Sequence, residues 1–301
     1  MRFRSNRRTH TLWVLVLLLG LFLWWAYTSN RLTTFLAVPT PPASTGVVTS
    51  VPRTAPSGNR NLLLGNPSGA VHDPGQPTNY LIERPQYVLS YNRDRGIPNW
   101  VSWQLTPSDL GNVQRSNTFV ADTTLPKGWY RVTLDDYTGS GYDRGHMCPS
   151  ADRTATQKDN EATFVLTNIL PQAPDNNRST WEHLESLSRD LVNKGHVLYI
   201  IAGGDGDNGT IAKGKVSVPR YTWKIIVVMP KGESDVTRIT ADTPVIAVRI
   251  PNGLKNRLGD WDQYRVTVAS IEAATGYHFF TNLPPDIQSA LKSRIDPVPT
   301  D

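Results

Sequence analysis

Short apolar stretches, typical of β-strands, recur from the middle of the chain to its C-terminal part. The five clearest are residues 87–91, 100–105, 197–202, 223–229 and 245–250. The first two alternate between apolar and polar residues, and the segment between them holds Gly96 and Pro98. This pattern predicts a hairpin with a long loop from Asn92 to Asn99. The other three stretches are apolar almost throughout, which is typical of strands buried on both faces.

Helical patterns are fewer than strand patterns. The three expected helices span residues 179–193, 266–274 and 285–293. Ser179 and Glu182 have the spacing of a capping box, and Gly195 follows the end of the first helix. Gly276 follows the second helix in the same way. Strands and helices do not alternate regularly, so we predict an α+β fold with a central antiparallel β-sheet flanked by helices.

The first sixty residues have a different pattern. Residues 2–8 hold four arginines, and the segment from Leu12 to Tyr27 is almost purely apolar. A basic start followed by an apolar run predicts export, with the arginines held in the cytoplasm. The run of about 16 residues is shorter than the roughly 20 that span a membrane. No Ala-x-Ala cleavage site follows at once, so residues 1–30 fit both a cleaved signal peptide and an uncleaved anchor.

The whole chain has 301 residues, and the composition after residue 30 indicates a linker followed by a folded domain. Residues 31–60 are rich in Pro, Ser and Thr and are expected to form a disordered linker. We expect the folded domain at residues 61–295 and a short tail at 296–301. Seven of the 31 basic residues lie in the first sixty positions, which hold no acid, so the remaining 24 bases face 26 acids. Any nucleic-acid site in the domain must therefore be a local arrangement of cations.

Asp143-Arg144-Gly145-His146 places an acid, a base, a glycine and a histidine in four consecutive positions. It resembles the DRGH motif of the DNA/RNA non-specific endonucleases, the ββα-metal nucleases that include endonuclease G. Residues 167–172 and 175–177, followed by Trp181 and Glu185, are similar to the segment in which the family's metal-binding asparagine leads into its catalytic helix. The resemblance runs from about residue 62 to about residue 293. It looks closest to the secreted sugar-non-specific nucleases of cyanobacteria.

His146 is the candidate general base. Hydrolysis of a phosphodiester needs a proton acceptor, neutralisation of the charge on the phosphorane and stabilisation of the leaving oxygen. The ordinary pKa of histidine, near 6.5, suits water activation at neutral pH. We expect an apparent pKa within about a unit of that value, lowered by the neighbouring Arg144. For a histidine without this motif, a satisfied core position would be the preferred interpretation.

Asn177 is the metal ligand that the resemblance implies, since the family's ligand lies eight positions before its helix glutamate, here Glu185. An amide oxygen is a hard, neutral donor, and Mg²⁺ in proteins keeps several waters and few protein ligands. Without the resemblance, an asparagine before a helix is more often a turn or cap residue. Asn176 is the alternative residue for that capping role.

Glu185 and Arg189 are four positions apart and share one helix face. Without the resemblance they would be interpreted as a surface ion pair. With it, Glu185 orients metal-bound water and Arg189 clamps phosphate. The resemblance also implies Arg115 as a transition-state arginine. Arg144 is expected to bind phosphate, with an internal strut as the alternative, and Asp143 is expected to hold the motif through hydrogen bonds to the backbone.

Two other patterns are set aside. Residues 205–209 resemble a calcium loop, but Val216 occupies the position of the closing glutamate, so a tight turn is expected. Cys148 is the single cysteine, which excludes an intrachain disulfide. A buried thiol is favoured over a nucleophile at this position.

These observations predict an exported endonuclease that depends on Mg²⁺ or Mn²⁺. It would hydrolyse single- and double-stranded DNA and RNA to 5′-phosphate products without strong sequence preference. The alternatives are a metal-dependent phosphodiesterase on small substrates and an inactive binding module with the same fold. The domain is expected in the periplasm, outside the cell, or anchored to the outer side of the cytoplasmic membrane. A protein inhibitor is the further partner class that we expect.

Overall fold

The structure is a computed structural model that describes residues 58–229, 231 and 236–299. All of these belong to the compact unit Arg53–Asp301. The expected export segment, most of the linker and the last two residues lie outside the described residues. In the part that is described, no helix has both the length and the apolar character needed to cross a membrane.

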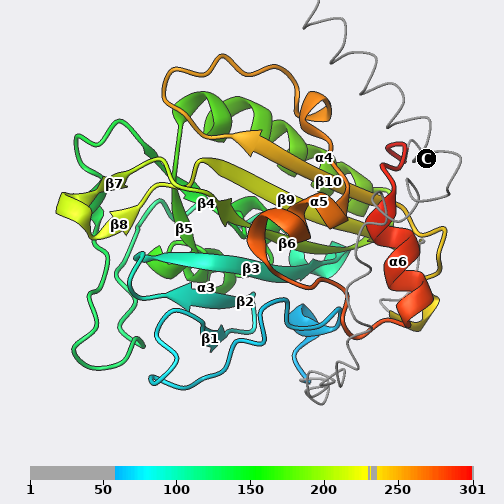
Figure 1. Cartoon of the computed structure of the whole chain (residues 1–301), viewed down its shortest axis with the longest axis horizontal. Helices are drawn as coiled ribbons and strands as arrows, with labels where there is room; N and C mark the ends of the chain where they lie inside the picture. Colours follow the sequence, from blue (N-terminus) through cyan, green and yellow to red (C-terminus); the bar gives the residue numbers. More distant parts are fainter. Residues whose placement is uncertain (1–57, 230, 232–235, 300–301) are drawn as a thin grey trace, which may run out of the picture. The chain divides into compact units, whose positions relative to one another are not determined.

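A six-stranded, entirely antiparallel sheet forms the centre of the unit, in the order β1-β2-β3-β6-β9-β10 (Figure 1). Its strands are β1 (Tyr80–Glu83), β2 (Val88–Asn92), β3 (Ile97–Leu105), β6 (Val197–Asp205), β9 (Tyr221–Met229) and β10 (Val245–Pro251). The predicted antiparallel sheet and its five strands are confirmed. The predicted loop between the first two strands is too long, because Gly96 adopts φ 64° and its N–H donates to Asn92 O at 2.9 Å. That tight turn lets pairing resume at Ile97.

The sheet is buried on both faces, which explains the continuous apolar runs of β6, β9 and β10. In β9, Ile226 and Val228 belong to the core on one face, whereas Ile225 and Val227 belong to the core on the other. The first face is covered by α4 (Trp181–Asn193), and the second by α5 (Val268–Thr275) and α6 (Pro285–Ser293). Figure 1 shows α4 behind the sheet and α5 in front of it.

The helix ends follow local signals with one exception. The helix α6 has the predicted bounds, and α5 ends at Gly276 with φ 73°. The helix α5 begins at Val268 rather than at 266, because the Thr267 side chain accepts a hydrogen bond from the Ser270 N–H. The predicted capping box of Ser179 and Glu182 is wrong.

A π-helical turn, Asn176–Thr180, leads directly into α4, so Ser179 lies inside helical backbone and forms no cap. The N–H of Trp181 donates to Asn176 O in this turn. The first N–H of α4 therefore has a partner without a side-chain cap.

Two shorter strand pairs stand apart from the sheet. The strands β4 (Asp143–His146) and β5 (Ile169–Gln172) pair antiparallel, with α3 (Gln157–Ala162) between them in sequence. The strands β7 (Thr210–Ile211) and β8 (Val216–Ser217) form a small hairpin after the turn at 205–209. Because β5 continues through the π-helical turn into α4, the chain forms a ββα unit on one face of the central sheet.

Candidate active site

The glycine of the four-residue motif is required by the packing of β4 against β5. A Cβ on Gly145 would lie 2.0 Å from Gln172 Oε1 and 2.6 Å from Gln172 Cβ. Real Cβ contacts are never that short, so the Gln172 side chain occupies the space that any larger residue would need. Gly145 thus lets β4 approach β5 closely and sets the position of the next residue, His146.

The end of β4 is held by the side chain of Asn168, which is fully buried. Its Oδ1 accepts the Cys148 N–H at 3.0 Å, and its Nδ2 donates to Cys148 O at 2.9 Å. The Met147 N–H donates to Asn168 O at 3.0 Å. Cys148 itself is free and buried, and burial raises the pKa of its thiol. The expected buried thiol is confirmed, since a thiol with a raised pKa is a poor nucleophile.

His146 lies in an aromatic enclosure with 7% of its surface exposed. Its ring centroid is 4.8 Å from that of Phe164 and 5.3 Å from that of Phe119. Its Nε2 is buried and has no hydrogen-bond partner among the described residues. Burial, with smaller contributions from Arg115 and Arg144, lowers the pKa of His146 to about 3. The pKa of His146 is thus lowered as expected, but by more than the expected unit, and burial rather than the neighbouring arginines is the largest cause.

The two arginines beside His146 are placed by the same aromatic rings. The guanidinium of Arg144 lies 4.8 Å from the Phe119 ring centroid, and that of Arg115 lies 5.0 Å from the Phe164 centroid. Arg115 also donates from Nη1 to Ser150 Oγ at 2.6 Å. Arg115 and Arg144 therefore flank the histidine, although Arg115 comes from a distant loop. Both guanidinium groups have the geometry and charge to bind phosphate oxygens.

Asp143 holds the π-helical turn before α4 through side chains, so the expectation of hydrogen bonds to the backbone is wrong. It accepts two hydrogen bonds from Arg178, at 2.7 and 2.6 Å, and one from Asn177 Nδ2 at 3.0 Å. Burial acts to raise the pKa of Asp143, but these hydrogen bonds hold it below its ordinary value. The carboxylate thus fixes the orientation of the Asn177 amide.

The two candidate asparagines are consecutive in the π-helical turn but differ in burial. Asn176 is fully buried, and its Nδ2 donates to Thr222 Oγ1 at 2.8 Å. Asn177 is only partly buried, and in the described residues its Oδ1 accepts no hydrogen bond. The Oδ1 of Asn176 also lacks a hydrogen-bond partner in the described residues, but it is buried, so of the two only Asn177 lies where a hydrated cation could reach it.

The donor chemistry fits a hydrated hard cation. Residues 58–229, 231 and 236–299 contain no cluster of three or more His, Cys, Asp or Glu side chains that could hold a metal ion. An ion held by the Asn177 oxygen would keep most of its water ligands, as Mg²⁺ prefers. Glu185 on α4 supplies a carboxylate with 13% of its side chain exposed, suited to accept hydrogen bonds from such waters.

Glu185 and Arg189 share a helix face as predicted, but they do not form a surface ion pair with each other. Glu185 Oε1 lies 3.5 Å from Lys224 Nζ, whereas Arg189 contacts Asp152 at 3.4 Å and Glu182 at 3.7 Å. Burial raises the pKa of Glu185 to about 7, against the opposing effect of Lys224. Glu185 also interacts electrostatically with Arg115, which links this group to the histidine side of the site.

The sequence interpretation missed Lys224, Asp152 and Ser150. Lys224 interrupts an otherwise apolar strand, and that charged residue in a buried pattern is a signal that could have found it. Ser150 and Asp152 lie just after the four-residue motif, in the turn Ser150–Asp152. They hold Arg115 and Arg189 respectively.

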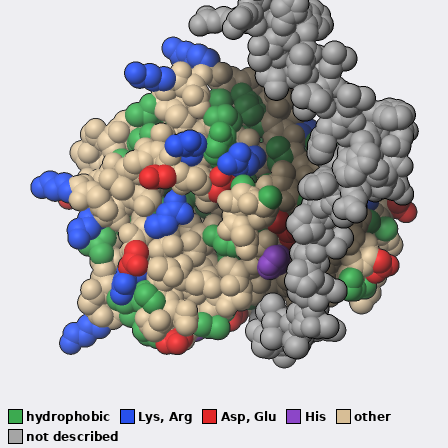
Figure 2. Space-filling model, in the orientation of Figure 1, with side chains coloured by type: hydrophobic (Ala, Val, Ile, Leu, Met, Phe, Trp, Pro, Cys, Tyr) green, Lys and Arg blue, Asp and Glu red, His purple; other side chains and the backbone are tan. Residues whose placement is uncertain are grey.

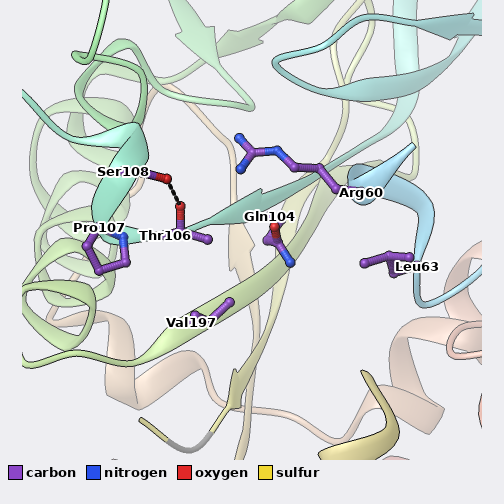
Figure 3. A pocket seen from close by; sticks show the side chains of 7 residues that line it. All are labelled: Arg60, Leu63, Gln104, Thr106, Pro107, Ser108 and Val197. Carbon is purple, nitrogen blue, oxygen red and sulfur yellow. Dashed lines mark hydrogen bonds between the residues drawn. The ribbon is translucent and has the colours of Figure 1, made fainter. Parts of the chain in front are cut away.

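The charges on the face seen in Figure 2 form no continuous basic patch. On the face seen in Figure 2, basic side chains are scattered among acidic ones. A cavity of about 540 Å³ opens near the end of β3 and is lined by Arg60, Gln104 and Thr106 among others (Figure 3). It shares no lining residue with the predicted site, and Arg60 is already paired with Asp109.

A ββα unit with a neutral histidine between two arginines, and an asparagine oxygen at the entry to the helix, defines a nuclease of the ββα-metal class. The chain belongs to the DNA/RNA non-specific endonuclease family, whose sequence profile matches residues 64–286. It is therefore an enzyme that hydrolyses nucleic acids. Nucleases of this family depend on a metal ion.

Three comparisons illustrate the relationship. The chain is 53% identical to a nuclease of Nostoc sp. over 244 residues, covering 80% of this chain and 88% of the relative. It is 31% identical to mitochondrial endonuclease G of Bos taurus over 240 residues, covering 73% and 77% of the two chains. A chain in the crystal structure of the EndoG/EndoGI complex superposes with a TM-score of 0.61 at 28% identity, covering 77% of this chain and 95% of that one.

Proposed function

We propose that this chain is an exported, Mg²⁺- or Mn²⁺-dependent endonuclease that cleaves single- and double-stranded DNA and RNA to products with 5′-phosphate ends. The observation that carries the proposal is the Nε2 of His146, which is buried, lacks a hydrogen-bond partner in the described residues and lies beside Arg115 and Arg144. The low pKa keeps His146 neutral at physiological pH, which is the form that a general base needs.

Each candidate residue has a role in this proposal. His146 takes a proton from the attacking water, while Arg115 and Arg144 bind the non-bridging oxygens of the phosphate. Asn177 holds the cation, which when bound supplies Lewis-acid stabilisation of the leaving 3′ oxygen. Glu185 orients water in the cation's shell, and Arg189, held by Asp152, contacts phosphate. No base edge is addressed by these groups, so little sequence preference follows.

Cleavage of supercoiled plasmid by the full chain, with Mg²⁺ and with EDTA, tests the proposal. We expect nicking and linearisation with Mg²⁺, none with EDTA, and parallel cleavage of single-stranded DNA and RNA. The product ends should accept radiolabel from polynucleotide kinase only after phosphatase treatment. Activity on a nitrophenyl phosphodiester without plasmid cleavage would favour the small-substrate phosphodiesterase. Binding of DNA without either activity would favour the inactive module.

Export is proposed from the four arginines and the apolar run at the N-terminus. A reporter enzyme that is active only in the cytoplasm, fused after Asp301, should remain silent. A strong reporter signal would refute export. The same fusion, fractionated with the membranes, separates an anchored chain from a released one.

A protein inhibitor is the remaining partner that we propose. The EndoG/EndoGI complex is described as showing a mechanism of EndoG inhibition. We expect that EndoGI, titrated into the plasmid assay, reduces cleavage by this chain in proportion to the amount bound. Undiminished cleavage at saturating EndoGI would exclude an inhibitor of that kind.

A further inference from the structure

Lys224 is a lysine on an interior strand of the central sheet, with 1% of its side chain exposed. It lies on β9, between the core residues Trp223 and Ile225, and its side chain points toward α4. Its Nζ lies 3.5 Å from Glu185 Oε1, 4.0 Å from the Trp181 ring centroid and 5.9 Å from the Trp103 centroid. The ammonium group is thus enclosed by two indole rings and one carboxylate.

This position is unfavourable for a lysine unless the charge has a partner. Burial lowers the pKa of Lys224, and Glu185 acts to raise it again. An apolar residue like the neighbours of Lys224 on β9 would avoid the desolvation cost altogether. A lysine here is therefore better explained by what it does to Glu185 than by its contribution to the core.

The charged groups that face Glu185 come from four parts of the chain. One is the loop that carries Arg115, a cation on the histidine side of the site, and the buried thiol of Cys148 also interacts with Glu185. Lys224 contributes a cation from β9, and Arg189 contributes a second cation from α4 itself. Asp152 contributes an anion from the turn Ser150–Asp152, where it accepts hydrogen bonds from Trp103 Nε1 at 3.0 Å and Arg189 Nη1 at 3.4 Å. Because Arg189 is held by Asp152, Lys224 is the cation that contacts Glu185 directly.

We propose that Lys224 is a positioning residue that increases the ionised fraction of the Glu185 carboxylate at neutral pH and holds its orientation toward the water shell of the bound cation. The proposal deepens the function proposed above and rests on the role given there to Glu185. Lys224 is too deeply buried to contact a nucleic acid, so it acts through Glu185. Without Lys224, Arg189 alone among the groups on β9 and α4 opposes burial and the negative charge of Asp152, so a larger fraction of the Glu185 carboxyl is protonated at neutral pH.

The test compares Lys224→Met in the full chain with wild type. Methionine keeps the unbranched shape of the side chain and removes its charge. Lys292→Met is the matched control, since Lys292 on α6 forms a partly buried ion pair with Glu272 at 2.9 Å on the opposite face of the sheet. Single-turnover cleavage is measured from pH 5.5 to 9.5. Glu185→Gln and the double variant with both substitutions complete a double-mutant cycle.

We expect Lys224→Met to lose about fivefold or more of the cleavage rate at pH 7, since a rise of about one unit from a pKa of about 7 lowers the ionised fraction of Glu185 from about one half to about one tenth. The loss should shrink toward pH 9 as Glu185 ionises, and Lys292→Met should follow the wild-type profile. In the Glu185→Gln background, Lys224→Met should cause no further loss. A loss of equal size at every pH, or an equal further loss in that background, would show a structural role and overturn the proposal.

A direct measurement separates this inference from the proposed function. Carbon-13 NMR of the glutamate carboxyls, with Glu185 assigned through Glu185→Gln, reports its protonation without metal or substrate. Its titration midpoint should rise by about one unit or more in Lys224→Met. An unchanged midpoint overturns the role of Lys224 even if the wild-type enzyme cleaves plasmid. If Lys224→Met fails to fold, nitrogen-15 NMR of wild-type Lys224 decides, because a neutral amine at pH 7 would also overturn it.

Discussion

Replacing Gly145 with alanine tests whether close packing of β4 on β5 positions His146, the proposed general base. The new Cβ would lie 2.0 Å from Gln172 Oε1, 2.6 Å from Gln172 Cβ and 2.8 Å from Gln172 Cδ. The amide could rotate away from the first and last of these contacts, but the Cβ contact can be relieved only if the two strands separate. Overpacking of this kind typically costs about 1–3 kcal/mol.

The loss of stability should lower the melting temperature by about 4–8 °C if the cost is ~2 kcal/mol, given the size of the folded unit. The cleavage rate of the folded variant should fall as well. His146 is the next residue along β4, and a displacement of about 1 Å in an active site can cost on the order of 10²-fold in rate. Thermal unfolding followed by circular dichroism and single-turnover plasmid cleavage measure the two effects.

Gln172→Gly provides the rescue. Both polar atoms of the Gln172 amide are buried without a hydrogen-bond partner in the described residues, so removing them forfeits no hydrogen bond. The double variant should recover about 1–2 kcal/mol relative to the sum of the single changes. Gly58→Ala is the control, because a Cβ there meets nothing within 4 Å. The reasoning fails if Gly145→Ala is as stable and active as wild type, or if Gln172→Gly brings no recovery.

Four further predictions concern the site. His146→Ala should lose about 10²–10⁴-fold in cleavage rate while binding metal and DNA as wild type does; loss of metal affinity by calorimetry would make His146 a ligand instead. The pKa of His146 is about 3 in the folded protein and near 6.5 in the unfolded chain. This group should therefore leave the free energy of unfolding unchanged above pH 6.5 and lower it by up to about 1.4 kcal/mol for each pH unit below that. Urea unfolding of His146→Leu, which should lack that part of the slope, measures the effect. Asn177→Ala should leave the fold intact and abolish most metal-stimulated cleavage, with partial recovery at high Mg²⁺; full activity at trace metal would place the ligand elsewhere. The logarithm of DNA affinity should fall with log salt at a shallow slope, reflecting ~2–4 phosphates, and a much steeper slope would reveal a positive surface outside this site.

Local patterns in the sequence were enough for five of the six strands of the central sheet and for most helix ends, whereas the candidate motif was found by its resemblance to a nuclease family. Alternation over two residues identified β2 and β3, and unbroken apolar runs identified three strands buried on both faces. Gly276 marked the end of α5, because its φ of 73° is accessible to glycine at little cost. The eight-residue step from Asn177 to Glu185 was informative because both residues lie on one continuous helical segment.

Tertiary structure alone decided what lies opposite each of these residues. Periodicity predicts which face of an element is buried, but it carries no information on the partner across the core. Asp143 meets Arg178 and Asn177, and Arg115 meets Ser150, only because the chain folds back on itself. The low pKa of His146 and the pairing of Lys224 with Glu185 arise in the same way. Burial and charge act through space between residues that are far apart in the chain, so the electrostatics of the site emerge only when the sheet and α4 pack together.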